Sequence, residues 1–146
     1  MRLFDYRWIL ILCLSISAMN GMAQSETDTV QIADPHFLEA LLWWGVDEDD
    51  DQVITFGEAA SQISLYVSSR EISDLTGIEA FSRLEQLYCA NNQLTQLDVS
   101  GCTSLTLLDC GANQLKRLDL SSNGDLNTLY CGWNELLELE IGRAHV

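Results

Sequence analysis

One short stretch of the chain, Asp47–Glu58, has oxygen-bearing side chains at regular spacing, in the sequence DEDDDQVITFGE. Acids stand at alternate positions through its first half, and another acid closes it. A calcium ion binds six to eight oxygens, and a loop of twelve residues can wrap them around it. The spacing therefore predicts a calcium site. Its ligands would be five side chains and one backbone carbonyl, from Asp47, Asp49, Asp51, Val53 (the carbonyl), Thr55 and Glu58.

The stretch resembles the calcium loop of an EF-hand when Asp47 is counted as position 1 and Glu58 as position 12. Ile54, at position 8, fits the apolar position that packs such loops. Position 6 departs from the pattern: it is usually glycine, because the backbone has positive φ there, and it is Gln52 here. That departure costs about 1 kcal/mol. A non-binding acidic turn and a degenerate relic stay open as alternatives, although carboxylates this crowded repel one another and favour a bound cation.

Two helices must flank this loop for its ligands to converge. Asp34 and Pro35 are typical of a helix start, with aspartate as the N-cap and proline at the first helical position. Gly45 is placed to end that helix, and a second helix is expected from about Phe56 to Gln62. Apolar residues recur at helical spacing in the first helix: Phe37, Leu38, Leu41, Leu42 and Trp44. A helix packed on a core explains this stripe without any ligand.

The rest of the chain is organised by a unit of 21 residues that occurs three times, as Leu84–Ser104, Leu105–Asp125 and Leu126–Val146. Self-similarity at such a fixed period is typical of a solenoid, in which each unit buries its apolar face against its neighbours. Leucine, cysteine and asparagine keep their places from unit to unit. The aligned sets include Leu87/Leu108/Leu129, Cys89/Cys110/Cys131 and Asn92/Asn113/Asn134.

Each unit splits into two similar halves, and each half fits the leucine-rich repeat signature L-x-x-L-x-L-x-x-(N/C)-x-L, with cysteine at the third apolar place of the first half. The chain resembles secreted bacterial leucine-rich repeat proteins of the internalin type, over nearly all of residues 32–140. The resemblance implies an α/β solenoid: a β-rich array of parallel strands with an N-terminal helix–loop–helix cap. Alternation along each strand should send Leu87 and Cys89 inward and Tyr88 outward.

Asparagine and cysteine are expected to be structural in this array. Asn92, Asn113 and Asn134 should form a ladder in which each side-chain amide satisfies buried backbone groups. The cysteines at positions 89, 110 and 131 form one inward column, where cysteine acts as a small apolar residue. Cys102 falls at the corner position, another buried slot. Free thiols are the prediction, and one disulfide stays open for an exported chain.

A candidate partner surface lies on the outward side of the first-half strands. Tyr88 and Tyr130 are expected to flank Asp109, with Trp133 at the margin. Aromatic residues dominate contact energies in interfaces, so this group is a plausible patch for a protein or a glycan. Ordinary solvent-facing strand residues are the alternative interpretation.

The chain divides into segments of distinct composition. Arg2 and Arg7 precede the apolar run 8–14, and small residues precede Gln24, which predicts a secretory signal peptide that is cleaved without membrane insertion of the mature chain. The pattern of the repeats is lost from Ile141 onward. The segments are 1–23, signal peptide; 24–31, flexible leader; 32–62, helix–acidic loop–helix cap; 63–83, irregular first repeat; 84–140, leucine-rich repeats; and 141–146, a foreign or truncated tail.

Charge and motif content limit the function. A net charge of −15 with a pI near 4.1 argues against nucleic acid and anionic membrane surfaces as partners. No catalytic constellation is present, so a non-enzymatic module is predicted, secreted or on the bacterial cell surface, that binds a protein or glycan or mediates adhesion. An accessory binding region of a larger secreted enzyme is the alternative, and a structural stalk is a third possibility.

Overall fold

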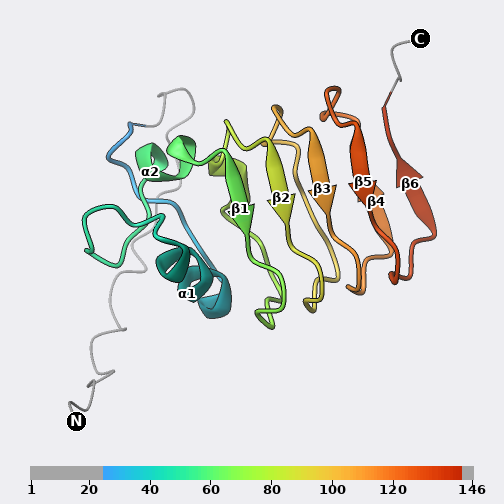
Figure 1. Cartoon of the computed structure of the whole chain (residues 1–146), viewed down its shortest axis with the longest axis horizontal. Coiled ribbons are helices and arrows are strands. Elements are labelled where there is room, and N and C mark those ends of the chain that lie inside the picture. The colour runs from blue at the N-terminus through green and yellow to red at the C-terminus, as the bar shows by residue number, and fades with distance from the viewer. Residues whose placement is uncertain (1–24, 143–146) are drawn as a thin grey trace, which may run out of the picture.

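The computed structural model of the chain describes residues 25–142, which form a helical cap followed by coils stacked in a row (Figure 1). The predicted signal peptide and residues 143–146 of the predicted tail lie outside this range. The elements are α1 (Pro35–Trp44), α2 (Phe56–Ser61), β1 (Ser64–Tyr66), the 3-10 turn η1 (Ile78–Ala80), β2 (Gln86–Tyr88), β3 (Leu107–Asp109), β4 (Arg117–Asp119), β5 (Thr128–Tyr130) and β6 (Glu138–Glu140). Between residues 25 and 142, no helix combines the length and the apolar character that crossing a bilayer requires.

The coils are held together by two parallel sheets, one from each half of the repeat. The first-half strands pair in the order β1-β2-β3-β5, and the second-half strands β4 and β6 pair with each other. Gln86 pairs with Leu107, 21 positions on, whereas Ser64 pairs with Gln86, 22 positions on. The predicted parallel solenoid is confirmed, and its first turn is longer than the others, as expected for the end of an array.

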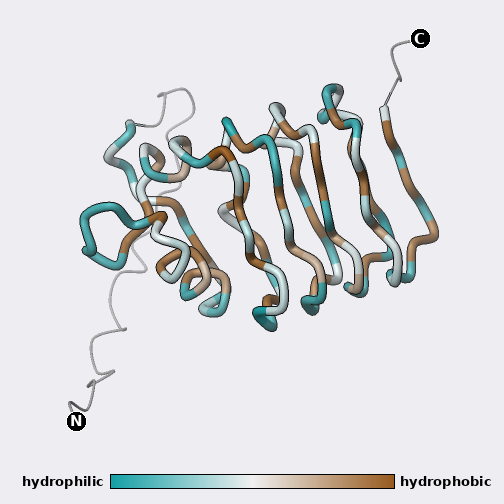
Figure 2. Tube along the Cα trace, viewed as in Figure 1, coloured by the Kyte–Doolittle hydropathy of each residue, from teal (hydrophilic) through white to brown (hydrophobic). Residues whose placement is uncertain are grey.

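Leucine side chains fill the space between the two sheets. Leu87, Leu108 and Leu118 are fully buried, whereas Leu129 of the last coil is only partly covered. Figure 2 shows the hydrophobic stretches recurring from coil to coil and the hydrophilic ones at the turns and in the acidic loop. Full burial of one such side chain contributes about 1.5–3 kcal/mol relative to leaving it exposed. This repeated burial is the main source of stability for elements only three residues long.

The predicted asparagine ladder is present at the corners after β2, β3 and β5. Asn113 donates from Nδ2 to the carbonyls of Cys89 (3.1 Å) and Cys110 (3.0 Å), and its Oδ1 accepts from the Leu94 N–H at 3.0 Å. Asn92 and Asn134 make the same pattern of bonds one coil before and one coil after. Each amide thus satisfies the backbone groups of two neighbouring coils, which fixes their spacing.

All four cysteines between residues 25 and 142 are free thiols, as predicted for structural residues. Cys89, Cys102 and Cys110 are fully buried. Burial raises the pKa of the Cys102 and Cys110 thiols to about 12. A thiol with such a pKa stays protonated at neutral pH and is neither a nucleophile nor a good metal ligand.

The cap is fastened to the first coil by one carboxylate. Asp34 Oδ1 caps α1 by accepting from the N–H groups of His36 (2.8 Å) and Phe37 (3.3 Å). Its Oδ2 accepts from the backbone N–H and the hydroxyl of Ser73, at 2.8 and 2.7 Å. The predicted start of the helix is confirmed, and so is its end, because Gly45 adopts a left-handed φ of 82° as the C-cap.

The prediction of a flexible leader is wrong for residues 25–31. This segment runs antiparallel to the end of the acidic loop, with the Val30 N–H donating to the Ile54 carbonyl at 2.7 Å and the Phe56 N–H donating to the Asp28 carbonyl at 2.9 Å. Val30 is buried in the core. The segment is polar except for Val30, so its composition gave no sign of an ordered structure. Val30 becomes buried only when the acidic loop and the first coil are in place.

Candidate functional site

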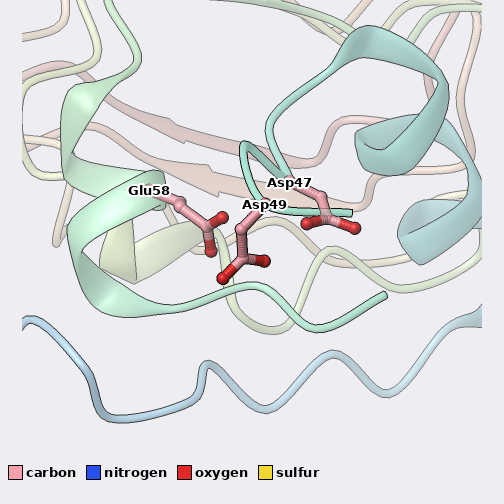
Figure 3. A group of neighbouring side chains, drawn as sticks. All are labelled: Asp47, Asp49 and Glu58. Carbon is pink, nitrogen blue, oxygen red and sulfur yellow. The ribbon is translucent and has the colours of Figure 1, made fainter. Parts of the chain in front are cut away.

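The acidic loop brings three of the predicted calcium ligands together. One carboxylate oxygen each from Asp47, Asp49 and Glu58 lies within 4.8 Å of the others (Figure 3). Glu58 comes from the first turn of α2, and the two aspartates come from the loop that follows α1. Asp51 is not in this group, and its carboxylate accepts from the Val53 N–H at 2.8 Å.

The backbone of the loop has the conformation that a calcium loop needs at position 6. Gln52 has a φ of 66°, and its N–H donates to the Asp47 carboxylate at 2.9 Å. The Asp51 N–H donates to the other oxygen of the same carboxylate at 3.2 Å. The left-handed turn predicted for position 6 is therefore confirmed, and the chain adopts it without glycine.

The last two predicted ligands form a capping box at the start of α2. The Thr55 hydroxyl accepts from the Glu58 N–H at 3.3 Å and donates to Glu58 Oε2 at 2.7 Å. Glu58 Oε1 accepts from the Glu48 N–H at 2.8 Å. Among the described residues, no hydrogen bond reaches the Val53 carbonyl, which leaves it available as a ligand.

The carboxyl groups of the loop differ in pKa. Desolvation raises the pKa of Asp49, and the charges of Asp51, Glu58 and Asp47 raise it further. Desolvation also opposes ionisation of Glu58, but hydrogen bonds from Thr55 and Glu48 outweigh it and lower the pKa of that group. A site with only oxygen donors suits a hard cation such as calcium, and a cation would relieve the repulsion felt by Asp49.

The predicted partner surface is brought together in part. Tyr88, Asp109 and Tyr130 stand opposite one another on β2, β3 and β5, so Asp109 is flanked by two tyrosines as expected. Trp133 is not in this line. It lies at the turn after β5 with a φ of 58°, and its side chain is 91% exposed.

An aromatic row, defined as Trp43, Trp44, Tyr66 and Tyr88, extends this surface onto the cap. The Tyr66 and Tyr88 rings are stacked, with centroids 4.4 Å apart and planes 7° apart. Trp44 lies 4.9 Å from Tyr66, and Trp43 lies 6.5 Å from Trp44. The Arg70 guanidinium sits 4.2 Å from the centre of the Trp43 ring. Such pairs each contribute about 0.5–1.5 kcal/mol beyond the area they bury.

Sequence reasoning missed three members of the aromatic row. A signal for Tyr66 was present, because Leu65-Tyr66 repeats the pair Leu87-Tyr88 at the equivalent place in the previous coil. No comparable signal existed for Trp43 and Trp44, which lie on α1 and reach the strands only through the docking of the cap. Trp43 is 67% exposed, so packing against the hydrophobic core does not explain the position of its side chain.

The opposite face carries a groove of about 960 Å³, whose lining includes Asp98, Lys116, Arg117 and Asp119. Two of its three aspartates accept hydrogen bonds from serines in local turns. Hydrogen bonds from Ser100 lower the pKa of Asp98, and those from Ser121 lower the pKa of Asp119. Both carboxylates therefore serve to close turns, which makes this groove the weaker candidate site.

The coils, the inward leucines and the asparagine ladder together define a leucine-rich repeat solenoid. No protein-family model and no curated protein matches the chain. Several solved structures do match the chain. The functional domain of InlJ from Listeria monocytogenes, which includes a cysteine ladder, has a TM-score of 0.61 and 28% identity, over 78% of this chain and 26% of that one.

Two further structures share the arrangement. An internalin from Listeria monocytogenes, InlF, has a TM-score of 0.60 and 24% identity, over 77% of this chain and 37% of its own. The structure of CBM51-2 in complex with GlcNAc and INT domains, from ZmpB of Clostridium perfringens, has a TM-score of 0.54 and 25% identity, over 68% of this chain and 21% of its own. The protein thus has the internalin-like leucine-rich repeat fold, with turns of about 21 residues, and spans between a quarter and two fifths of the two Listeria structures.

Proposed function

We propose that this protein is a non-catalytic binding module that recognises a protein or glycan ligand, or mediates adhesion, through the face made by β1, β2, β3 and β5. The observation that carries the proposal is the aromatic row together with Tyr130. These rings run across the strands and the cap and are exposed, except for the partly buried Tyr88. Exposed aromatic clusters of this kind mark interaction sites, because their burial on binding contributes much of the contact energy. The internalin-like fold supports the same role by analogy.

The proposal includes export, to the medium or to the bacterial cell surface. Its support is the N-terminal pattern of two arginines, an apolar run and small residues before Gln24. Expression with this segment intact, followed by N-terminal sequencing of the protein recovered outside the cytoplasm, tests it. A mature start at Gln24 is expected, and retention of the whole chain inside the cell would contradict export.

The binding face can be tested by selecting ligands for it and then altering its rings. Ligands are selected for the wild type from a peptide library and from a glycan array, and their affinities are measured again on Tyr88→Ala and Tyr130→Ala. A loss of about ten-fold or more is expected, the size typical of a central interface residue. Arg117→Ala, on the opposite face, is the matched control and should leave the affinities unchanged. Ligands that bind both tyrosine variants as tightly as the wild type would disprove this face.

We also propose that the acidic loop binds calcium, with Asp47, Asp49 and Glu58 as the converging carboxylates and the Val53 carbonyl as a further ligand. Calcium would stabilise the folded cap, because only the folded loop gathers these oxygens. Calorimetric titration with calcium should give saturable heat for the wild type and none for Asp47→Ala or Glu58→Ala. Asp125→Ala, an acidic residue in the repeats, is the control. No heat for the wild type at millimolar calcium would exclude the site.

An accessory role within a larger secreted enzyme is the second candidate. Its support is the likeness to the structure of CBM51-2 in complex with GlcNAc and INT domains from ZmpB. Selection of a glycan rather than a peptide in the experiment above would favour this role. Selection of peptides alone would favour a protein ligand.

A further inference from the structure

The face proposed for binding contains one carboxylate among its rings, at Asp109. Its register partners are Tyr88 on β2 and Tyr130 on β5. Neighbouring strands lie about 4.8 Å apart, so the two tyrosines are anchored about 10 Å apart with Asp109 between them. We call Tyr88, Asp109 and Tyr130 the tyrosine notch. Two positions further on, just past the ends of these strands, stand Ala90, Gly111 and Gly132, whose small size leaves the notch open along one side.

The Asp109 carboxylate is held in place but is not neutralised. Its Oδ1 accepts from the Gly111 N–H at 3.2 Å. Within residues 25–142 the only ion pairs are those of Arg117 with Glu138 and Glu140, so no cationic side chain pairs with Asp109. The side chain is partly buried, and the cost of removing a charge from water is larger for an unpaired carboxylate than for a paired one. A cation of a ligand would therefore be stabilised by pairing with the Asp109 carboxylate.

We propose that the tyrosine notch binds a basic side chain, arginine or lysine, of a protein partner. The inference rests on the proposed function, because it names the chemistry that the binding face recognises. Asp109 supplies the counter-charge for the cation, and the rings of Tyr88 and Tyr130 supply cation–π contacts on its two sides. Arginine fits best, because its flat guanidinium can donate to the carboxylate while it lies against a ring.

Charge complementarity favours this occupant over a neutral glycan. The chain carries a net charge of −15, which attracts basic segments over long distances and raises their association rate. The Tyr66 and Tyr88 rings face each other at 4.4 Å, so the faces they turn toward each other are closed to a sugar. Tyr130, at 58% exposed, keeps its ring accessible on the far side of Asp109.

Asp119 provides a matched control within the same molecule. It holds the outward position on β4 that Asp109 holds on β3, and it accepts from the Ser121 N–H two residues on, at 3.0 Å. Its register partner is Glu140, and no ring lies in register with it. A basic peptide attracted only by the general negative charge should therefore lose the same affinity when either aspartate is substituted. A peptide that needs the tyrosine notch should lose affinity only when Asp109 is substituted.

The test uses two probes, the pentapeptide Ac-Gly-Gly-Arg-Gly-Gly-NH2 and its counterpart with citrulline, which has nearly the shape of arginine but no charge. Amide chemical shifts of the full chain are followed by NMR during titration. We expect the arginine peptide to shift the amides of Tyr88, Asp109, Gly111 and Tyr130 saturably, and the citrulline peptide to bind about ten-fold more weakly or not at all. Asp109→Asn keeps the acceptor for the Gly111 N–H, so the turn is preserved, and should lose the preference for arginine. Asp119→Asn should retain it.

Equal binding of the two peptides, or an unchanged arginine preference in Asp109→Asn, would overturn the inference. The library selection separates this outcome from failure of the proposed function. One contrary outcome is a ligand without a basic residue whose binding is lost on Tyr88→Ala. Another is a glycan that binds Asp109→Asn as tightly as the wild type. Either outcome would support the binding face and refute the basic partner. Selected peptides enriched in arginine that lose affinity on Asp109→Asn would support both.

Discussion

The face made by β1, β2, β3 and β5 carries rings in contact with one another, whereas the face made by β4 and β6 carries charged side chains. On the first face Tyr66 stacks on Tyr88 and continues to Trp44 of the cap. On the second, Arg117 lies 3.5 Å from Glu138 and 3.8 Å from Glu140. Both faces rest on the same buried leucines, so the interior does not distinguish them.

The difference between the faces teaches where binding can arise in such a solenoid. Exposed ion pairs like those of Arg117 contribute little, because water and salt screen them and two long side chains must be ordered. Stacked rings contribute more, and they also leave apolar area to be buried by a ligand. The buried leucines and the asparagine ladder recur from coil to coil, but the outward residues do not. Only the first face therefore carries the rings on which the proposed binding rests.

The largest effect is expected when the frame common to both faces is broken. Asn113→Ala removes four hydrogen bonds and leaves the buried Leu94 N–H without its partner. A loss of about 2–4 kcal/mol in the free energy of unfolding is expected, since each buried orphan costs about 1–3 kcal/mol. Chemical denaturation measures it. Gln114→Ala, at the exposed neighbouring position, is the control, and equal losses in the two variants would contradict the ladder as the frame.

The next effect concerns the cap, which carries two rings of the aromatic row. Asp34→Ala removes both the N-cap of α1 and the bonds to Ser73, and should cost about 2 kcal/mol. Loss of near-ultraviolet circular dichroism from Trp43 and Trp44 should accompany it, because the cap would no longer hold them against the strands. Asp28→Ala, another acid of the N-terminal segment, should have a much smaller effect.

Asp34 should also make the stability depend on pH. Burial opposes its ionisation, but the hydrogen bonds from Ser73, His36 and Phe37 outweigh it, so its pKa in the folded chain lies below the ordinary 3.8. The unfolded state therefore binds the proton more tightly, and acid favours unfolding. The stabilisation by Asp34 is complete above that ordinary value and is lost as the pH falls through the lower folded pKa. The stability difference between wild type and Asp34→Asn should shrink on acidification in that range, and a constant difference would contradict this.

A pair of double-mutant cycles measures the contrast between the faces directly. The Tyr66–Tyr88 pair should show a coupling energy of about 0.5–1 kcal/mol from ring stacking at a partly exposed site. The Arg117–Glu138 pair should show about 0–0.5 kcal/mol, and that value should fall further in high salt. Coupling of the ion pair as large as that of the rings would remove the energetic distinction between the faces.

An effect of similar, small size concerns the turns that end the first-face strands. Ser69, Asn91, Ala112 and Trp133 occupy equivalent places there and all have positive φ. Ala112→Gly should stabilise the protein by about 0.5–1 kcal/mol, because its φ of 51° strains any residue with a Cβ. Asn91→Gly should gain less, since asparagine tolerates this conformation. Thermal unfolding compares the two, and destabilisation by Ala112→Gly would show that the turn is not strained.

Much of the architecture could be predicted from the residues themselves. The period of 21, the inward Leu87 and Cys89, the Asn113 ladder and the limits of α1 all follow from local patterns that one coil or one helix can satisfy. The positive φ at Gln52 followed from position in the loop. These features are determined by nearest neighbours in the chain or in the next coil, which is why the sequence carries them.

The rest was decided by contacts between distant segments. The ordering of residues 25–31 depends on Ile54 and Phe56 as hydrogen-bonding partners, and polar composition gave no sign of that pairing. The approach of Trp44 to Tyr66 depends on the angle at which the cap docks, which Asp34 fixes through Ser73. The sequence alone thus determined the repeating frame, because its rules are local and recur. Only the tertiary structure decided that the aromatic surface continues onto the cap through Trp43 and Trp44, because that depends on how the cap meets the coils.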